Sequence, residues 1–132
     1  MNYLLDTHTW IWWNTAPEKL SRGVRTAIEH PKKNDVLLLS AISIWEVAKL
    51  IEKRRFRINI DTRLWVEQAL DIPRLRIAEL TPEIAVHSTE LPRPIHDDPA
   101  DQIILATARI ENAVVLSKDR LILDYPNVKA EW

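Results

Sequence analysis

The sequence Tyr-Leu-Leu-Asp-Thr-His at residues 3–8 decides the fold, because a short apolar run ends there in a carboxylate and a helical stretch follows. A brief, continuous apolar run is typical of a strand buried on both faces of a parallel sheet. The helical stretch carries Trp10, Ile11, Trp12 and Trp13 and is expected to end near Pro17. This order predicts a strand–helix unit of an α/β domain.

The same unit recurs along the chain. We expect further strands at residues 36–39, 75–80, 114–116 and 128–130. Helices are predicted at residues 19–29, 42–51, 64–70, 82–89 and 98–111. In the last of these, Pro99 lies in the first turn and Asn112 follows the end as a left-handed cap. The alternation predicts a single α/β domain over residues 1–132 with a mostly parallel sheet.

Two residue types are nearly absent, and their absence excludes several classes of site. The single glycine, Gly23, rules out a P-loop, a dinucleotide-binding turn and a nucleophile elbow, because each needs at least two glycines. The lack of cysteine excludes disulfides, zinc ribbons, iron–sulfur clusters and thiol catalysis. Any metal must therefore be held by oxygen or imidazole, which favours Mg²⁺ or Mn²⁺.

The charge balance and the first residues indicate an ordinary globular protein. Eighteen basic and nineteen acidic residues give a net charge of -1, which argues against a strongly basic nucleic-acid-binding surface but allows a local patch. The first residues include no basic segment and no long apolar run, so neither a signal peptide nor a membrane span is predicted. We expect a cytoplasmic protein.

Carboxylates follow the predicted strands. Asp6 comes directly after the first strand, Glu46 lies in the helix after the second, and Asp119 lies shortly after residues 114–116. Asp98 and Asp101 open the helix at residues 98–111. Ligands of open α/β sheets bind beyond the carboxyl ends of the strands, and carboxylates gathered there tolerate one another when a divalent cation lies between them. This pattern predicts metal-assisted phosphodiester hydrolysis.

Each acid also has an interpretation as a helix cap. Asp6 would cap a helix beginning near Thr7, and Asp119 would cap a turn at residues 120–123. Glu46 would close a capping box with Ser43, because the two fit the S-x-x-E pattern. Asp98 would be the N-cap of its helix, with Asp101 three residues later. Only the ordered set, not any single acid, favours a catalytic site.

Four segments of this set resemble the PIN-domain ribonucleases of the VapC toxin type. The first is the segment at residues 3–8. The others are Ser-Ala-Ile-Ser-Ile-Trp-Glu-Val-Ala at 40–48, His-Asp-Asp-Pro-Ala-Asp-Gln-Ile-Ile-Leu-Ala-Thr-Ala at 96–108 and Val-Val-Leu-Ser-Lys-Asp at 114–119. The segments occur in the family's order over almost the whole chain. The sequence departs from the family's pattern at Gln102, where relatives often carry arginine, and so lacks a partner for phosphate or acid there.

The resemblance implies a three-layer α/β/α sandwich and a metal-dependent endoribonuclease that leaves a 5′-phosphate and a 3′-hydroxyl. The implied catalytic and metal-binding residues are Asp6, Glu46, Asp101 and Asp119, with Asp98 and Ser117 in support. The implied cofactor is Mg²⁺ or Mn²⁺. The expected partners are an RNA substrate, an antitoxin of the VapB type and a second copy of the chain.

Basic, aromatic and histidine residues suggest further contacts. The only basic concentration is Lys53, Arg54, Arg55 and Arg57 with Arg63. It is either a solvated helix end or a patch for the RNA backbone, with Arg54, Arg55 and Arg57 as the candidate contacts. The six tryptophans fit core packing or a protein interface. His8 and His96 are candidate neighbours of the acidic site.

Three other functions compete with a nuclease. A phosphatase of the haloacid dehalogenase type needs a second aspartate two residues after Asp6, where His8 stands. A receiver domain needs its acid pair after the first strand, whereas the adjacent acids Asp97 and Asp98 come late. A PIN-fold module that binds RNA or protein without catalysis stays open as the alternative, although a lost site acid would be its signature and all four are present.

Overall fold

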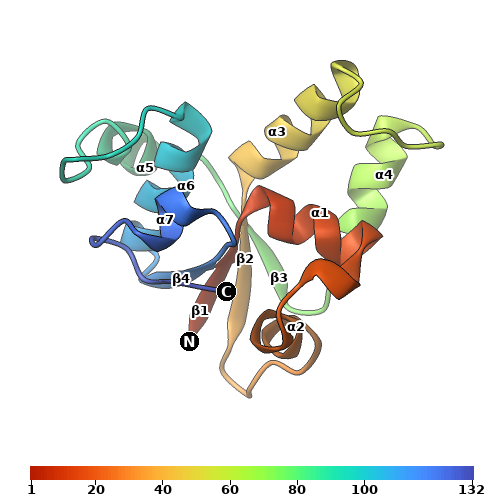
Figure 1. Cartoon of the computed structure of the whole chain (residues 1–132), viewed down its shortest axis with the longest axis horizontal. Helices are drawn as coiled ribbons and strands as arrows, with labels where there is room; N and C mark the ends of the chain where they lie inside the picture. Colours follow the sequence, from red (N-terminus) through yellow and green to blue (C-terminus); the bar gives the residue numbers. More distant parts are fainter.

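Five parallel strands form one sheet in the order β3-β2-β1-β4-β5, with helices on both of its faces (Figure 1). The computed structural model describes all residues, 1–132. The strands are β1 (Asn2–Leu5), β2 (Val36–Ser40), β3 (Leu75–Ala78), β4 (Ala113–Leu116) and β5 (Ala130–Glu131). The mostly parallel sheet predicted from the sequence is confirmed.

Seven α-helices connect the strands. They are α1 (Thr7–Thr15), α2 (Arg22–Glu29), α3 (Ala41–Glu52), α4 (Thr62–Ala69), α5 (Pro82–His87), α6 (Pro99–Ile110) and α7 (Arg120–Leu123). Asn112 follows α6 with a φ of 49°, which confirms the predicted left-handed cap. No helix combines the length and the apolar character that crossing a membrane would require.

Alternate strand residues face different helices, which produces three layers. Leu4, Leu38 and Val115 are fully buried in one core cluster together with residues of α5, α6 and α7. Leu5, Leu39 and Leu116 pack in a second cluster with residues of α1, α2, α3 and α4. The period of two in a strand thus fills both layers from one short apolar run. Figure 1 shows the two helix groups on either side of the sheet, which is the α/β/α sandwich expected from the sequence.

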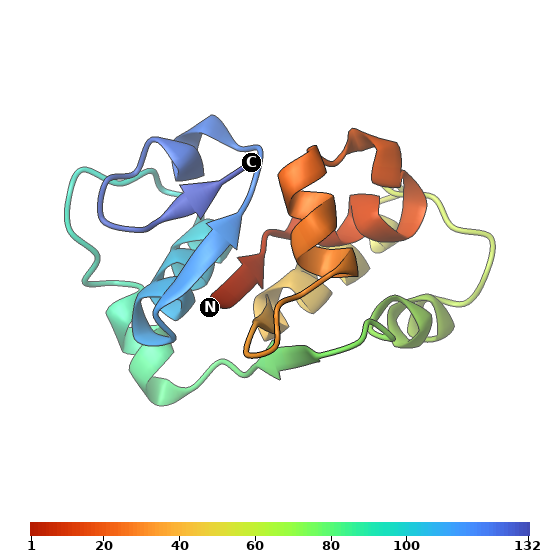
Figure 2. The same cartoon turned by 90° about the horizontal axis from the view of Figure 1, so that it is seen from below.

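The strand register brings the carboxyl ends of the central strands to one edge. Leu5 of β1 pairs with Leu39 of β2 and with Leu116 of β4, so Asp6, Ser40 and Ser117 follow at the same level. Parallel strands impose this alignment, and the chain leaves each strand over the same edge. The chain end, after β5, lies near this edge beside the α1 and α2 side of the sheet (Figure 2).

Several predicted boundaries are wrong by two residues: α4 begins at Thr62 instead of residue 64, β3 ends at Ala78 instead of residue 80, and α5 ends at His87 instead of residue 89. The bounds of α2 and β5 differ as well. The helix predicted at residues 19–29 begins only at Arg22, because Ser21 is its N-cap and accepts from Val24 N at 3.2 Å, while Pro17–Lys19 form a separate 3₁₀ helix. The last strand, predicted at residues 128–130, is Ala130–Glu131, because these residues pair with Val115 and Leu116.

Candidate active site

Asp6 lies at the centre of the carboxyl edge, directly after β1, with only 6% of its surface exposed. Its Oδ1 accepts from Thr7 N at 2.8 Å, so Asp6 caps α1 as predicted. Its Oδ2 accepts from the Ser117 hydroxyl at 2.7 Å. These two hydrogen bonds fix the orientation of a buried carboxyl group and satisfy both of its oxygens.

Glu46 lies on α3, half-buried, and its Oε1 accepts from the Thr7 hydroxyl at 2.6 Å. A second hydrogen bond, of 2.8 Å, joins that hydroxyl to the Ser43 hydroxyl. The capping-box interpretation of Glu46 is wrong, because α3 begins at Ala41 and its N-cap is Ser40, whose Oγ accepts from Ile42 N at 3.2 Å. Glu46 therefore does not cap the helix, and its carboxylate points toward Thr7, which follows β1.

Asp101 lies in the first turn of α6, and its side chain is 14% exposed. Its Oδ2 forms a hydrogen bond of 2.8 Å with His96 Nε2, which confirms His96 as a neighbour of the acidic site. Gln102 donates from Nε2 to the His96 carbonyl at 2.8 Å and so holds the loop that carries this imidazole. Asp98 caps the helix as predicted, accepting from Asp101 N at 3.1 Å.

Asp119 and Ser117 form the side of the site that follows β4. Asp119 is exposed, and its Oδ1 accepts from Leu121 N at 2.9 Å, which confirms it as the cap of α7. Its backbone N donates to the Ser117 hydroxyl at 3.0 Å. Ser117 thus connects Asp6 to the turn that carries Asp119.

Burial and mutual repulsion raise the pKa values of the three inner carboxyl groups. Desolvation is the largest cause for Asp6, Glu46 and Asp101. The charges of Asp98 and Asp6 add to it at Asp101, whose pKa is raised from 3.8 to about 6. Asp101, Asp6 and Asp98 raise the pKa of Glu46, and Asp119 raises that of Asp6. The five acids therefore act on one another through a shared electrostatic field.

The donor set fits a hard divalent cation. It offers carboxylate and hydroxyl oxygens, the ligand type that Mg²⁺ prefers. No three Asp, Glu or His side chains lie close enough together to form a complete cage. Such a cage is not required, because Mg²⁺ is usually held by one or two carboxylates and keeps several waters. After desolvation, the neighbouring carboxylates contribute to the raised pKa values of Glu46 and Asp101, and a cation would relieve this repulsion.

Sequence reasoning missed Thr7, Ser43 and the role of Gln102. Thr7 connects Asp6 to Glu46 through its backbone N and its hydroxyl. The available signal was its place directly after Asp6 in the segment at residues 3–8. Ser43 was interpreted only as part of a capping box, and the contact of Gln102 needs the fold to be seen.

The basic residues lie apart from the acids. Arg54, Arg55 and Arg57 are exposed in the turn after α3, two helical turns beyond Glu46. Figure 1 shows this turn at the far end of α3, whereas the carboxyl ends of β1 and β2, after which Asp6 and α3 follow, meet near the centre of the view. Their contact with RNA stays a prediction. His8, the other candidate neighbour, is exposed in the first turn of α1.

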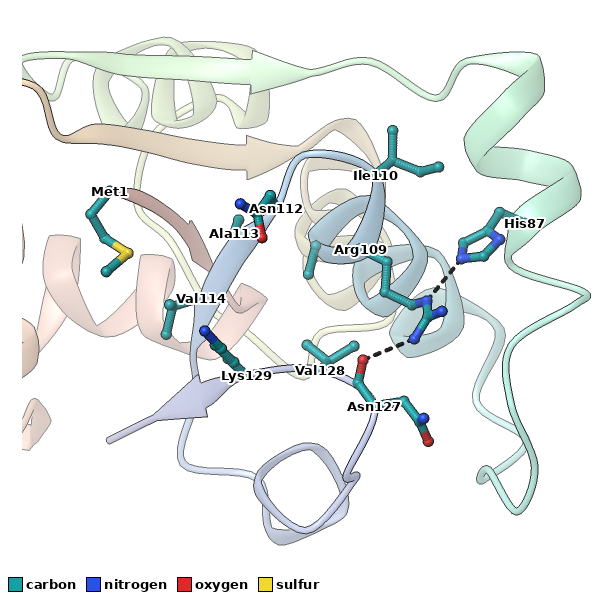
Figure 3. A pocket seen from close by; sticks show the side chains of 11 residues that line it. Met1, His87, Arg109, Ile110, Asn112, Ala113, Val114, Asn127, Val128 and Lys129 are labelled. Atoms are coloured by element: carbon teal, nitrogen blue, oxygen red, sulfur yellow. Dashed lines mark hydrogen bonds between the residues drawn. The ribbon is translucent and has the colours of Figure 1, made fainter.

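A separate hollow of about 580 Å³ lies at the opposite, amino-terminal edge of the sheet (Figure 3). Arg109 spans it, donating from Nε to His87 Nε2 at 3.0 Å and from Nη1 to the Asn127 carbonyl at 2.9 Å. None of the five site acids lines this hollow. This hollow is therefore separate from the candidate active site, which lies at the carboxylates.

The family model described as PIN domain matches residues 3–127, and the chain belongs to this family. We call the edge of the sheet that carries Asp6, Glu46, Asp98, Asp101 and Asp119 the acidic edge. Together with the fold and the family match it defines a PIN-domain protein. The chain is 37% identical over 117 residues to Ribonuclease VapC22 of Mycobacterium tuberculosis, an alignment that covers 89% of this chain and 86% of that protein.

Solved structures show the same fold. The structure of VapBC-1 from nontypeable Haemophilus influenzae matches with a TM-score of 0.71 at 19% identity, covering 99% of this chain and 97% of that one. The structure of VapBC2 from Rickettsia felis, bound to a DNA fragment from its promoter, matches with a TM-score of 0.70 at 19% identity, covering 99% and 98%.

Proposed function

We propose that this protein is a divalent-metal-dependent endoribonuclease that acts as the toxin of a toxin–antitoxin pair. The observation that carries the proposal is the convergence of Asp6, Glu46 and Asp101 at the carboxyl edge, where burial and repulsion raise their pKa values. Groups that are this costly to ionise are typical of functional sites. The likeness to a ribonuclease supplies the substrate class.

Asp6, Glu46, Asp101 and Asp119 would hold Mg²⁺ or Mn²⁺, directly or through waters. The chemistry expected of the ion is Lewis-acid activation of the scissile phosphodiester and of the attacking water. Thr7 and Ser117 donate hydrogen bonds that favour the charged forms of Glu46 and Asp6 and so prepare them as ligands. His96 does the same for Asp101. Asp98 holds the helix start and adds negative charge from the rim.

A cognate antitoxin is the second part of the proposal. The solved structures that share the fold include VapBC proteins and a toxin–antitoxin complex from Klebsiella pneumoniae. An uninhibited ribonuclease would damage its own host, so an inhibitor that covers the acidic edge is required. We place the protein in the cytoplasm, where such an RNA substrate would be found, and propose that it pairs with a second copy of itself.

Cleavage of RNA by purified protein tests the activity. Wild type should cut RNA with Mg²⁺ or Mn²⁺, stop in chelator, and recover when the ion is restored. Asp6→Asn and Asp101→Asn should be inactive yet folded, because asparagine keeps the size and shape of the side chain but is a weak neutral ligand. Asp97→Asn is the matched control, since it removes an exposed charge from the same loop.

Two outcomes would contradict the proposal. Cleavage that persists in a rigorously chelated sample would exclude the metal mechanism. A folded wild type that binds RNA but never cleaves it under any metal would favour the non-catalytic PIN-fold module instead. Sequencing the 5′ ends of the fragments after brief expression would identify the RNA that is cut.

A further inference from the structure

Three aromatic rings lie in a row beside the acidic edge, and we call His8, Trp12 and Trp132 the aromatic shelf. The His8 and Trp12 ring centroids are 5.8 Å apart, tilted by 56°, and those of Trp12 and Trp132 are 5.8 Å apart in an edge-to-face arrangement. His8 is exposed, and both tryptophans keep part of their surface accessible. The rings of the aromatic shelf therefore pack against one another and also keep surface that is exposed to solvent.

The backbone makes the shelf continuous with the acidic site. His8 stands in the first turn of α1, two residues after Asp6. Ser117 N donates to the Glu131 carbonyl at 3.0 Å, which brings Trp132 alongside the turn that begins at Ser117. Trp132 contacts Trp12 in the middle of α1, and the segments that carry these rings adjoin Asp6 and Ser117, whose side chains are hydrogen-bonded to each other.

Cations accompany these rings. Lys19 Nζ lies 5.7 Å from the Trp12 ring centroid. Lys118, Arg120 and Trp132 line an open hollow of about 700 Å³ next to Asp119. Arg120 pairs with Asp124 at 2.9 Å, and Glu131 also lines the hollow, so Lys118 is the cation best placed for a further anion. Lys19 covers part of the Trp12 ring, so the ring surface open to a ligand is that of exposed His8 and part-exposed Trp132. Exposed aromatic rings beside a cation that can contact a phosphate are the combination by which proteins bind single-stranded nucleic acid.

We propose that the aromatic shelf and Lys118 bind an unpaired nucleotide next to the phosphate that is cleaved. The base stacks against the shelf and Lys118 contacts the adjoining phosphate, which places the scissile bond over the acids. A base in a duplex is stacked between its neighbours and cannot reach the rings, so this contact requires an unpaired base. This inference rests on the proposed ribonuclease function and names its specificity-determining residues.

Affinity for RNA in chelator, where no cleavage occurs, is the first measurement. The probe is a fluorescently labelled single strand of about ten nucleotides, a length within the range that such sites cover. Trp132→Ala and His8→Ala should each weaken binding about tenfold, and Trp132→Phe should restore most of it, because phenylalanine keeps a stacking face. The same strand annealed into a duplex should bind more weakly than the free strand.

The salt dependence isolates Lys118. Lys118→Ala should reduce the slope of log affinity against log salt by about 0.7, the contribution of one phosphate contact on a single strand. Lys129→Ala is the matched control, because Lys129 is an exposed lysine in the hollow at the opposite edge of the sheet (Figure 3) and should leave both affinity and slope unchanged. In the metal-loaded enzyme, His8→Ala should raise KM while kcat stays within about twofold.

The outcomes separate this inference from the function on which it rests. His8 and Lys118 are exposed, so their variants keep the fold even if Trp132→Ala does not. If His8→Ala and Lys118→Ala bind and cleave RNA as wild type does, the shelf is not a nucleotide site, although the ribonuclease stands. The same result with weakened inhibition by the antitoxin would make the shelf a protein interface. A wild type that neither binds nor cleaves RNA overturns both.

Discussion

Thr7 is the residue through which two of the three inner carboxyl groups are held together. Its backbone N donates to Asp6 and its hydroxyl donates to Glu46, while Ser43 bonds to the same hydroxyl. Thr7 as a residue is 3% exposed, so water cannot replace these contacts. The buried Thr7 hydroxyl therefore fixes the position of the Glu46 carboxylate, on α3, relative to the segment that follows β1.

We predict that Thr7→Val destabilises the fold and weakens catalysis. The Ser43 hydroxyl and the Glu46 carboxylate would lose their partner, which should lower the free energy of unfolding by about 1–3 kcal/mol. Loss of a group that orients a metal ligand should reduce cleavage about 10- to 100-fold. Urea denaturation and a cleavage assay measure the two effects. Thr7→Ser is the control that keeps the hydroxyl, and a Val variant as stable and active as the Ser variant would contradict this role.

Asp101 should lower the stability of the metal-free protein at neutral pH. Its pKa is about 6 in the folded chain against an ordinary value of 3.8, so between these values the native state binds more protons than the unfolded state. The favourable contribution of Asp101 to the free energy of unfolding is present at low pH and is lost as pH rises through about 6. Because the side chain is partly screened by solvent, we expect a penalty of about 1–2 kcal/mol at pH 7.

Asp101→Asn should therefore raise the melting temperature of the metal-free protein by several degrees at pH 7 and by little at pH 4. The variant should also lose most of the stabilisation that Mg²⁺ gives wild type, since it lacks a charged ligand. Thermal melts at both pH values, in chelator and in Mg²⁺, provide the comparison. A variant that melts below wild type in chelator at pH 7 would show that the charge of Asp101 supports the fold instead.

At the scale of elements, α6 owes its start to a neighbour of the site. Asp98 caps the helix by accepting from Asp101 N, and Pro99 occupies the first turn. We predict that Asp98→Ala lowers the free energy of unfolding by about 1 kcal/mol, the usual effect of losing an N-cap. Asp98→Asn should retain most of the stability, because its amide oxygen can still accept. Equal loss in both variants would mean that the charge, not the cap, matters.

The strands and most helices could be predicted from the sequence because their signals are local. The apolar runs at β1, β2 and β4 are continuous, which is typical of strands buried on both faces. The proline and the acids at the start of α6 are strong signals for the beginning of a helix. Glu46 was ambiguous for a physical reason. The S-x-x-E pattern occurs inside α3 as well as at helix starts, and Ser40 is a rival cap only three residues earlier.

The site acids were predictable as a set, whereas their supporting contacts were not. Carboxylates placed after parallel strands must meet at one edge, so their grouping follows from topology. The bond between His96 and Asp101, and that between Gln102 and the His96 carbonyl, depend on how the loop before α6 turns back. The proximity of Trp132 to Trp12 depends on where β5 is added to the sheet.

At the scale of the whole molecule, one edge of the sheet concentrates negative charge on a protein of net charge -1. The simplest inhibitor of such a site is an inserted cation. We predict that a disordered antitoxin tail folds along apolar surface and places an arginine or lysine among Asp6, Glu46, Asp101 and Asp119. Arginine suits this position because its planar fork can bind two carboxylates. Buried apolar area must offset the cost of ordering the tail.

Replacing that arginine or lysine by alanine should weaken inhibition more than it weakens complex formation, because the apolar contacts remain. Residual ribonuclease activity of the purified complex, measured beside its Kd, decides the question. In cells, expression of the protein alone should arrest growth, and co-expression of the antitoxin should relieve the arrest. If the alanine variant still silences the enzyme at saturation, inhibition comes from covering the RNA path.

The central claim is that the acidic edge is a divalent-cation site, and a Mn²⁺ titration followed by calorimetry tests it most directly. Wild type and Asp97→Asn should bind Mn²⁺ alike, because Asp97 is exposed and contributes charge only from outside the site. Asp6→Asn and Asp101→Asn should bind at least about tenfold more weakly while remaining folded by circular dichroism. Equal Mn²⁺ affinity in all four proteins, or no binding by folded wild type, would contradict the account.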